Sequence, residues 1–348
     1  MRALTVVPLT KDSLAVTDVA DPVPRDGELL VEGIALGVCG TDREIARGDY
    51  GWAPPGADRL VLGHESLGRV RTAPEGSRLR PGDLVVGIVR RPDPVPCPAC
   101  ARGEFDMCRN GRYVERGIKE IHGYGSQLWT VEADYAIRLD PDLSDVGMLL
   151  EPATVVAKAW DHIERIGNRA WFGPRRVLIT GAGPIGQVAA LLGVQRGLEV
   201  HVLDRVESGV KPQLVRDLGG VYHTGDILEV TDKAEPDIII EATGADKLVL
   251  DAIEHSAAAG IVCLTGVSSA GRTVGIDAGA VNREIVLQND VVFGSVNANH
   301  RHYELAADAL AKADQSWLRR LITRRVPLER AAEAFQPDGD DVKVVIDL

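Results

Sequence analysis

The chain has 348 residues and a formal net charge of −12, from 39 basic and 51 acidic side chains. Hydrophobic residues make up 45% of it and charged residues 26%, the composition of a globular protein of about two domains. The acidic balance disfavours nucleic acid and anionic membranes as partners, and no apolar run is long enough to span a bilayer. Met1–Val7 leads directly into a strand-like pattern without a signal-peptide layout, so we expect a cytoplasmic protein.

The N-terminal part of the chain, up to about residue 157, is rich in short strand-like runs. Leu29–Val31 and Leu84–Val89 are two of them, and glycine- and proline-bearing loops separate such runs. Pro81-Gly82-Asp83 is a strong turn signal directly before the second. This pattern predicts an irregular β-barrel or sandwich.

From about residue 158 to 295, strand-like runs alternate with helical patterns. The apolar runs are Val177–Thr180, Val200–Leu203, Asp237–Glu241 and Ile261–Thr265. This alternation predicts βαβ units on a parallel sheet, and therefore an α/β fold class. The last part of the chain mixes helix with a closing strand at Val342–Ile346.

A glycine-rich turn, Gly181-Ala182-Gly183-Pro184-Ile185-Gly186, follows the first of these apolar runs. Its first glycine permits a tight turn, its second lets the backbone approach a pyrophosphate, and its third lets the helix pack close to the strand. The helix N-terminus offers amide groups to phosphates. Because an acid, Asp204, ends the next strand eighteen residues after Gly186, we interpret the turn as a dinucleotide site and not as a merely structural turn. The residues assigned to it are Gly181, Gly183, Pro184, Ile185, Gly186 and Asp204.

Asp204 also indicates which dinucleotide is bound. A carboxylate there can accept both ribose hydroxyls of NAD and repels the 2′-phosphate of NADP. Arg205 follows it and can pair with that phosphate, or else stack on the adenine or point to solvent. We expect NAD, with NADP as the alternative.

Cys39, His64 and Glu151 are metal-ligating residue types that lie far apart in the sequence. Each alone has an ordinary explanation: a small core residue, a hydrogen-bonded loop histidine, and a carboxylate near a helix N-terminus. Together they make a plausible set for a catalytic zinc, which typically keeps three protein ligands and one open position.

The order of these motifs resembles that of the zinc-dependent medium-chain dehydrogenases over essentially the whole chain. The motifs are Cys39-Gly40-Thr41-Asp42, Gly63-His64-Glu65, Pro81-Gly82-Asp83, Glu151-Pro152 and the glycine-rich turn. The resemblance implies a GroES-like catalytic domain, residues 1–157 and 296–348, interrupted by a Rossmann domain, residues 158–295. It implies Cys39, His64 and Glu151 as zinc ligands, and Glu65 as a catalytic carboxylate that ligates the zinc or lies behind it.

Three further stretches, Cys39–Ile45, Cys108–Ile118 and Gly294–Asn299, resemble the glucose 1-dehydrogenase branch of that family. The resemblance implies oxidation of a glucose-like aldose at C1 to the lactone, with zinc as Lewis acid and hydride transfer to NAD or NADP. It also implies a homodimer or homotetramer. The residues assigned by it are Glu115, Glu151 and Asn297 for the sugar, Thr41 for the reacting hydroxyl, and Thr265 and Asn297 for the cofactor.

Two alternatives remain at this stage. Sugar enzymes of the branch commonly carry an acid near the positions of Val155 or Ala157, and this chain has apolar residues at both. A cyclitol, a polyol or a simple alcohol is therefore the alternative substrate. A dinucleotide-binding protein without catalysis is the alternative of another class.

Three cysteines, Cys97, Cys100 and Cys108, crowd into twelve residues. They resemble the family's four-cysteine structural-zinc loop, with Gly103 in the place of the third cysteine. We expect zinc here, with Asp106 as a candidate fourth ligand, and the alternative is an empty site with free thiols. Cys263 lies in an apolar run and is interpreted as a core residue.

Charged residues elsewhere are expected to play minor roles. The pair Arg90-Arg91 is interpreted as a solvated loop pair, although it could steer a charged cofactor. His300 and His302, without an acid or cysteine beside them in sequence, are assigned surface or packing roles. Val291–Gly294 predicts a strand, which the family resemblance implies to pair two subunits.

Overall fold

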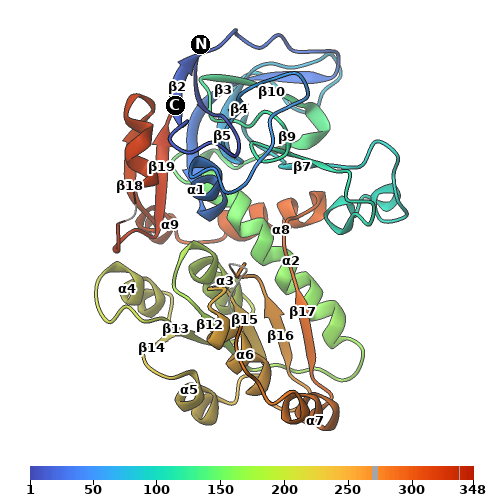
Figure 1. The fold of residues 1–348 in the computed structure, drawn as a ribbon, viewed down its shortest axis with the longest axis vertical. Helices are drawn as coiled ribbons and strands as arrows, with labels where there is room; N and C mark the ends of the chain where they lie inside the picture. The colour runs from blue at the N-terminus through green and yellow to red at the C-terminus, as the bar shows by residue number, and fades with distance from the viewer. Residues whose placement is uncertain (269–272, 337) are drawn as a thin grey trace. The chain divides into compact units, whose positions relative to one another are not determined.

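The computed structural model describes residues 1–268, 273–336 and 338–348. The chain divides into two compact units (Figure 1). The β-rich unit comprises Met1–Thr154 and Asn297–Leu348, so both ends of the chain build it. The parallel-sheet unit comprises Val155–Val296. The sequence-based prediction places these boundaries at 157/158 and 295/296.

The β-rich unit consists mostly of short strands. They are β1 (Arg2–Val6), β2 (Ala15–Asp18), β3 (Glu28–Val38), β4 (Leu60–Val61), β5 (Glu65–Thr72), β6 (Leu84–Gly87), β7 (Arg90–Arg91), β8 (Val114–Arg116), β9 (Glu120–Ile121), β10 (Leu128–Glu132), β11 (Ala136–Arg138), β18 (Ile322–Pro327) and β19 (Lys343–Asp347). Its helices are α1 (Gly40–Ala46), α8 (His300–Ala311), α9 (Gln315–Leu321) and short 3-10 segments. The predicted β-rich texture is confirmed.

The main sheet of this unit is organised around β3. The strand order is β11-β6-β5-β3-β19-β18, and β10 also pairs with β3. Buried and accessible residues alternate along the first half of β3. Ala35–Val38 at its end are all buried, as expected of a strand that is covered on both faces. β19 at the C-terminus lies beside β3 (Figure 1). The two strands pair antiparallel, with Val344 opposite Val38. This pairing places C-terminal residues beside the segment that leads to Cys39.

The parallel-sheet unit contains six strands among the residues that the structure describes. They are β12 (Arg176–Thr180), β13 (Glu199–Leu203), β14 (Val221–His223), β15 (Ile238–Glu241), β16 (Ile261–Leu264) and β17 (Val291–Gly294). Their order, β14-β13-β12-β15-β16-β17, is the doubly wound order 3-2-1-4-5-6. The α/β class with a Rossmann sheet is confirmed. The short and half-accessible β14 was not predicted, because Val221-Tyr222-His223 has too few apolar residues to stand out.

Helices alternate with these strands. They are α3 (Pro184–Gln195), α4 (Val210–Asp217), α5 (Ile227–Ala234), α6 (Asp246–Glu254) and α7 (Ala278–Gln288), and α2 (Leu150–Gly167) carries the chain in from the β-rich unit. All of these strands are parallel, and the order in which the chain adds them to the sheet reverses between β12 and β15. In open sheets of this kind, ligands bind at the carboxyl ends of the strands beside that reversal. The glycine-rich turn follows β12 and therefore lies at the expected place.

None of the helices in the described ranges combines the length and the hydropathy that crossing a bilayer requires.

Candidate functional site

Strand register brings Cys39 and His64 together although they lie far apart in sequence. Gly37 of β3 pairs with Glu65 of β5, so the residue after β3 lies beside the residue before β5. The Cys39 Sγ lies 3.1 Å from His64 Nε2. One ligand atom each from Cys39, His64 and Glu65 fall within 4.8 Å of one another. His64 and Glu65 are buried, and Cys39 is partly accessible.

Asp42 orients this pair. One carboxylate oxygen, Oδ2, accepts the backbone N–H of Cys39 at 3.0 Å, and Oδ1 lies 3.3 Å from His64 Nδ1. A carboxylate behind Nδ1 favours the tautomer in which Nε2 is free to bind a metal, the usual arrangement behind a ligating histidine. Asp42 is part of the motif Cys39–Asp42, but the sequence analysis did not predict that it would orient the histidine.

The electrostatics of the cluster fit a divalent cation. Burial raises the pKa of the Cys39 thiol. Burial opposes protonation of His64, but Asp42 and Cys39 together raise its pKa well above the ordinary value. Burial, with Glu65 adding to it, raises the pKa of Glu151 to about 7. The cluster is thus short of positive charge, and its thiol, imidazole and carboxyl donors are those that zinc prefers. Zinc bonds of about 2.0–2.3 Å separate neighbouring ligand atoms by roughly 3.5 Å, close to the observed spacing.

Glu151 lies at the start of α2 and is not part of the trio of mutually close ligand atoms. Its carboxyl is near enough for the charges of His64 and Glu65 to shift its pKa. Its assignment as a zinc ligand stays a prediction. Thr41 lies in the first turn of α1, two residues after Cys39, and is partly accessible.

Glu65 has a partner that sequence analysis missed. The Nζ of Lys343 donates to both carboxylate oxygens, at 2.7 and 2.6 Å, and both side chains are at most 2% exposed. The signal was present, because a single lysine within the apolar run Val342–Ile346 is unusual for a central strand. A Cβ on Gly37 would overlap the Glu65 carboxylate, so glycine is required there. Glu65 is therefore held beside the Cys39–His64 pair by a buried lysine.

Lys343→Met is expected to lower the free energy of unfolding by about 3–5 kcal/mol, because it leaves a buried carboxylate without its counter-charge. Urea denaturation, carried out on protein from which a chelator has removed all metal, measures this change in the free energy of unfolding. The double variant Glu65→Leu/Lys343→Met removes both charges and should recover at least half of the loss. A single variant that unfolds at the same urea concentration as the unaltered protein would show that the pair is not coupled.

The predicted sugar-binding residues Glu115 and Asn297 lie side by side. Asn297 Nδ2 donates to Glu115 Oε1 at 2.7 Å, although 182 residues separate them. Glu115 is buried, and it pairs with Arg90, whose Nη2 lies 3.0 Å from Oε1. The structure therefore brings these two predicted residues into one cluster within the β-rich unit.

The interpretation of Arg90 and Arg91 as a solvated loop pair is wrong. Both form the short strand β7 and are only 6% and 7% exposed. Arg90 pairs with Glu115, and Arg91 pairs with Glu132 at 2.7 Å. Sequence gave no sign of this, because each arginine meets a carboxylate that lies far along the chain.

The sulfur atoms of Cys97, Cys100 and Cys108 lie within 4.8 Å of one another, as a shared metal requires. Backbone N–H groups, that of Arg109 first, lower the pKa of Cys97 to about 6, whereas burial raises that of Cys100 to about 11. The Asp106 carboxylate instead accepts a hydrogen bond from Asn299 Nδ2 at 2.8 Å, and it is not in the trio. A zinc ion on the three thiols stays a prediction, and Asp106 is poorly placed as its fourth ligand.

The prediction of surface or packing roles for the two histidines at the start of α8 needs a partial correction. The ring of His300 packs against Phe105 and Tyr135, with centroids 5.6 and 5.2 Å away, as a packing role requires. His302 is 1% exposed, and its Nδ1 lies 3.9 Å from an Asp106 oxygen, so an acid does lie beside it. Cys263 is buried in β16, as expected.

In the parallel-sheet unit, the glycine-rich turn has the shape that a dinucleotide needs. Gly181 has a φ of +91°, which disfavours a side chain, and a Cβ on Gly186 would overlap the Gly181 carbonyl oxygen. A Cβ on Gly183, by contrast, would point into open space, the space that a pyrophosphate would fill. Pro184 and Ile185 are the first residues of α3, which begins directly after Gly183, and a helix N-terminus attracts phosphate groups.

Asp204 is fixed at the end of β13. Its Oδ2 accepts the N–H of Ala182 at 2.6 Å, and its Oδ1 accepts that of Val206 at 3.1 Å. Arg205 is exposed. Thr265, which follows β16, donates from its hydroxyl to the carbonyl of Glu241 at 2.8 Å. The carboxylate of Asp204 is therefore held beside the glycine-rich turn, where a ribose would lie in this fold.

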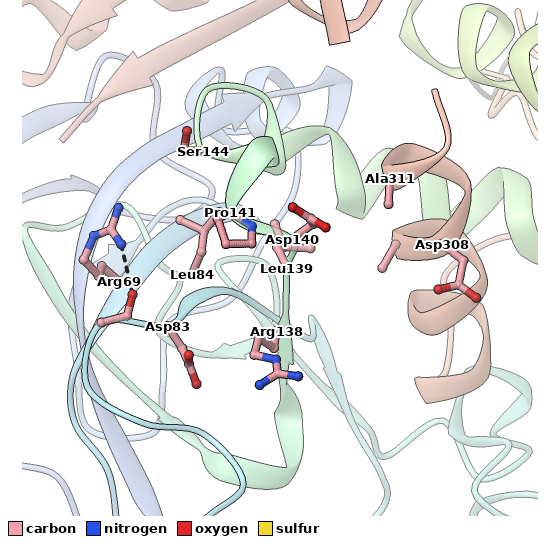
Figure 2. A pocket seen from close by; sticks show the side chains of 12 residues that line it. Arg69, Asp83, Leu84, Arg138, Leu139, Asp140, Pro141, Ser144, Asp308 and Ala311 are labelled. Carbon is pink, nitrogen blue, oxygen red and sulfur yellow. Dashed lines mark hydrogen bonds between the residues drawn. The ribbon is translucent and has the colours of Figure 1, made fainter. Parts of the chain in front are cut away.

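A separate cavity of the β-rich unit, of about 480 Å³, carries none of the predicted site residues (Figure 2). Arg69, whose Nη1 donates to the Gly82 carbonyl at 2.9 Å, and Asp83 line one side, and Asp308 and Ala311 of α8 line the other. Charged groups of both signs line it together with Leu84 and Leu139. Nothing in this lining assembles a metal or nucleophilic site.

Comparison with known proteins agrees with this geometry. The family model for the alcohol dehydrogenase GroES-like domain matches residues 25–141. Together with the Rossmann sheet, this match identifies the chain as a zinc-dependent medium-chain dehydrogenase. The model for the glucose dehydrogenase C-terminus matches residues 144–348. The chain belongs to the glucose dehydrogenase family within that class.

Relatives match over nearly their full length. The glucose 1-dehydrogenase of Methanocella arvoryzae is 40% identical over 357 residues, which cover 100% of this chain and 99% of the relative. That of Thermoproteus tenax is 39% identical over 353 residues and 99% of each chain. The glucose dehydrogenase of Haloferax mediterranei, solved in complex with NADP, Zn and gluconolactone, has a TM-score of 0.92 and 32% identity, covering 100% of this chain and 99% of that one.

Proposed function

We propose that the chain oxidises a glucose-like aldose at C1 to the lactone, with zinc bound at Cys39 and His64 and with NAD as the preferred hydride acceptor. The observation that carries this is the buried pair of Cys39 Sγ and His64 Nε2, 3.1 Å apart, with Asp42 behind the imidazole. The relatives that match the whole chain are glucose dehydrogenases, which supports the sugar as substrate.

When bound, zinc supplies a Lewis acid for the reacting hydroxyl, and the nicotinamide supplies the hydride acceptor. The chain supplies the remaining functions. Cys39 and His64 hold the metal, with Glu151 as the proposed third ligand and Glu65 held back by Lys343. Thr41 relays the proton of the reacting hydroxyl: its Oγ1 accepts that proton while its own hydroxyl proton passes to solvent, so that Thr41 ends the step neutral.

Glu115, Glu151 and Asn297 are proposed to hold the other hydroxyls of the sugar. A carboxylate and an amide together accept and donate hydrogen bonds, as a polyhydroxylated ligand requires. Sites built on such buried polar groups discriminate strongly against analogues that lack a hydroxyl.

In the parallel-sheet unit, the turn Gly181–Gly186 is proposed to hold the pyrophosphate, with Thr265 as a further cofactor contact. Asn297, which belongs to the β-rich unit, is also proposed to contact the cofactor. Asp204 accepts the ribose hydroxyls of NAD. The Haloferax relative was solved with NADP, so NADP is the second cofactor to test. Arg205, exposed beside Asp204, is the group that could receive its 2′-phosphate.

We also propose a cytoplasmic homodimer or homotetramer. The edge strand β17 is partly accessible, and α7 beside it exposes Val286 and Leu287 to 64% and 61%. Exposed apolar side chains on the helix that leads into an edge strand of the described sheet support a subunit contact. None of the five cysteines, all of them in the described part of the chain, forms a disulfide, which supports a reducing compartment.

NADH formation by zinc-loaded protein against aldoses, cyclitols, linear polyols and simple alcohols tests the substrate. We expect the highest kcat/KM with glucose or a close epimer. Activity confined to a cyclitol or an alcohol would contradict the sugar assignment while leaving the zinc chemistry in place. Absence of turnover on every substrate class, with either NAD or NADP, would contradict the enzymatic proposal.

A further inference from the structure

The two oxygens of the Glu115 carboxylate are used differently. Oε1 accepts three hydrogen bonds: one from Asn297 Nδ2 at 2.7 Å, and two from Arg90, Nε at 3.1 Å and Nη2 at 3.0 Å. No hydrogen bond within the described part of the chain reaches Oε2. The protein therefore fixes the carboxylate through one oxygen and leaves the other for a ligand.

Arg90, which holds Glu115, is itself fixed by contacts with two further residues. Its Nη1 donates to the backbone carbonyl of Asp106 at 3.0 Å, and its guanidinium carbon lies 3.7 Å above the ring of Tyr113. The side chain is nearly fully buried. The donors of a planar guanidinium have a rigid mutual geometry. The bond to Asp106 therefore fixes the orientation of the Arg90 guanidinium, and with it the direction from which Arg90 binds Glu115.

Asp106 also holds the segment that carries Asn297. Its Oδ1 accepts from Asn299 Nδ2 at 2.8 Å, and both residues are buried. Asn297 has a φ of +61°, a conformation that is uncommon for a residue other than glycine. Asn299, two residues further on, anchors this turn and caps α8 by accepting the Arg301 N–H at 3.1 Å.

Asp106 lies in the short 3-10 helix Phe105–Met107, between Cys100 and Cys108. Asp106 therefore belongs to the loop between the first and last of the three clustered cysteines. Its backbone carbonyl holds Arg90 and, through Arg90, Glu115. Its carboxylate holds Asn299 and, through Asn299, the turn at Asn297. A loop that only stabilised the fold would not need to contact both sugar-binding segments through one residue.

We propose that Arg90, Asp106 and Asn299 are positioning residues for sugar recognition, which together aim Oε2 of Glu115 and the amide of Asn297 at the hydroxyls of the substrate. This rests on the proposed sugar dehydrogenase function. In this arrangement the cysteine loop, Cys97–Cys108, serves as the scaffold of the substrate site.

Arg90→Lys tests this, because a lysine keeps the charge but cannot hold Glu115 and Asp106 at once. We expect the KM for glucose to rise about tenfold, with kcat and the KM for NAD changed less than about twofold. Asn299→Ser retains a helix-capping side chain but is too short to reach Asp106, and should raise the glucose KM by about three- to fivefold.

Arg91→Lys is the matched control. Arg91 is the next residue of β7, is equally buried and binds a carboxylate by the same fork, but its partner is Glu132. Its glucose KM should stay within about twofold of the unaltered protein. If Arg90→Lys and Arg91→Lys raise the glucose KM equally, the effect is general destabilisation and the proposal is overturned.

Monodeoxyglucoses make the test more specific. The KM penalty of Arg90→Lys should disappear for the one deoxyglucose that lacks the hydroxyl bound by Oε2. An equal penalty for every deoxyglucose overturns the positioning role, even where the glucose KM rises. If the unaltered protein oxidises no aldose, the proposed function fails and this inference falls with it; if it oxidises glucose and the variants do not differ, only this inference fails.

Discussion

Cys39→Ser and His64→Ala should each lower the turnover of the sugar about a thousandfold or more. Each removes one of the proposed zinc ligands, and loss of the Lewis acid raises the activation free energy by several kcal/mol. Turnover and bound zinc are measured on the same preparations. Affinity for NADH, measured by fluorescence titration, should stay unchanged, because the glycine-rich turn lies in the other unit.

Cys263→Ser is the control for this pair. It removes a buried thiol of β16 and should leave both the zinc content and turnover near those of the unaltered protein. If Cys39→Ser or His64→Ala kept full activity after treatment with a chelator, the assignment of the catalytic metal would be wrong.

Asp204→Ser should change the preference for NAD over NADP about a hundredfold in favour of NADP. The substitution removes both the acceptor of the ribose hydroxyls and the charge that repels a 2′-phosphate. A loss of about 1.4 kcal/mol on one cofactor and an equal gain on the other give this factor. The measurement is kcat/KM for the two cofactors at saturating sugar.

Glu207→Ser removes an exposed carboxylate three residues further on and controls for the change in overall charge. It should alter the cofactor preference less than about twofold. In the Asp204→Ser background, Arg205→Ala should weaken NADP if Arg205 pairs with the 2′-phosphate. A cofactor preference that Asp204→Ser leaves unchanged would show that this carboxylate does not contact the ribose.

The parts of the site that lie close together in sequence could be predicted from it. Gly181–Gly186 is one continuous turn. The segments on either side of it have the patterns of a strand and a helix, and this context identifies the turn as a dinucleotide-binding motif. Cys39, His64 and Glu115 were found only by family resemblance, because the register of β3 against β5 that unites the first two is not visible as a local pattern.

The buried ion pairs were the main feature of the site that could not be predicted from the sequence. Arg90 and Lys343 meet carboxylates 25 and 278 residues away, and hydrophobic periodicity carries no information on such pairs. Arg90 stands in a run of two arginines beside proline, which is typical of a surface loop. Lys343 interrupts an apolar strand, and that interruption was the one local sign that a charge is buried there.

The most direct test of zinc-dependent sugar oxidation is to remove all metal from the protein and titrate zinc back while following NADH formation from glucose. We expect no measurable turnover without metal and a rise that saturates with filling of the Cys39–His64 site, absent in His64→Ala. Full glucose oxidation by the metal-free protein would contradict the account.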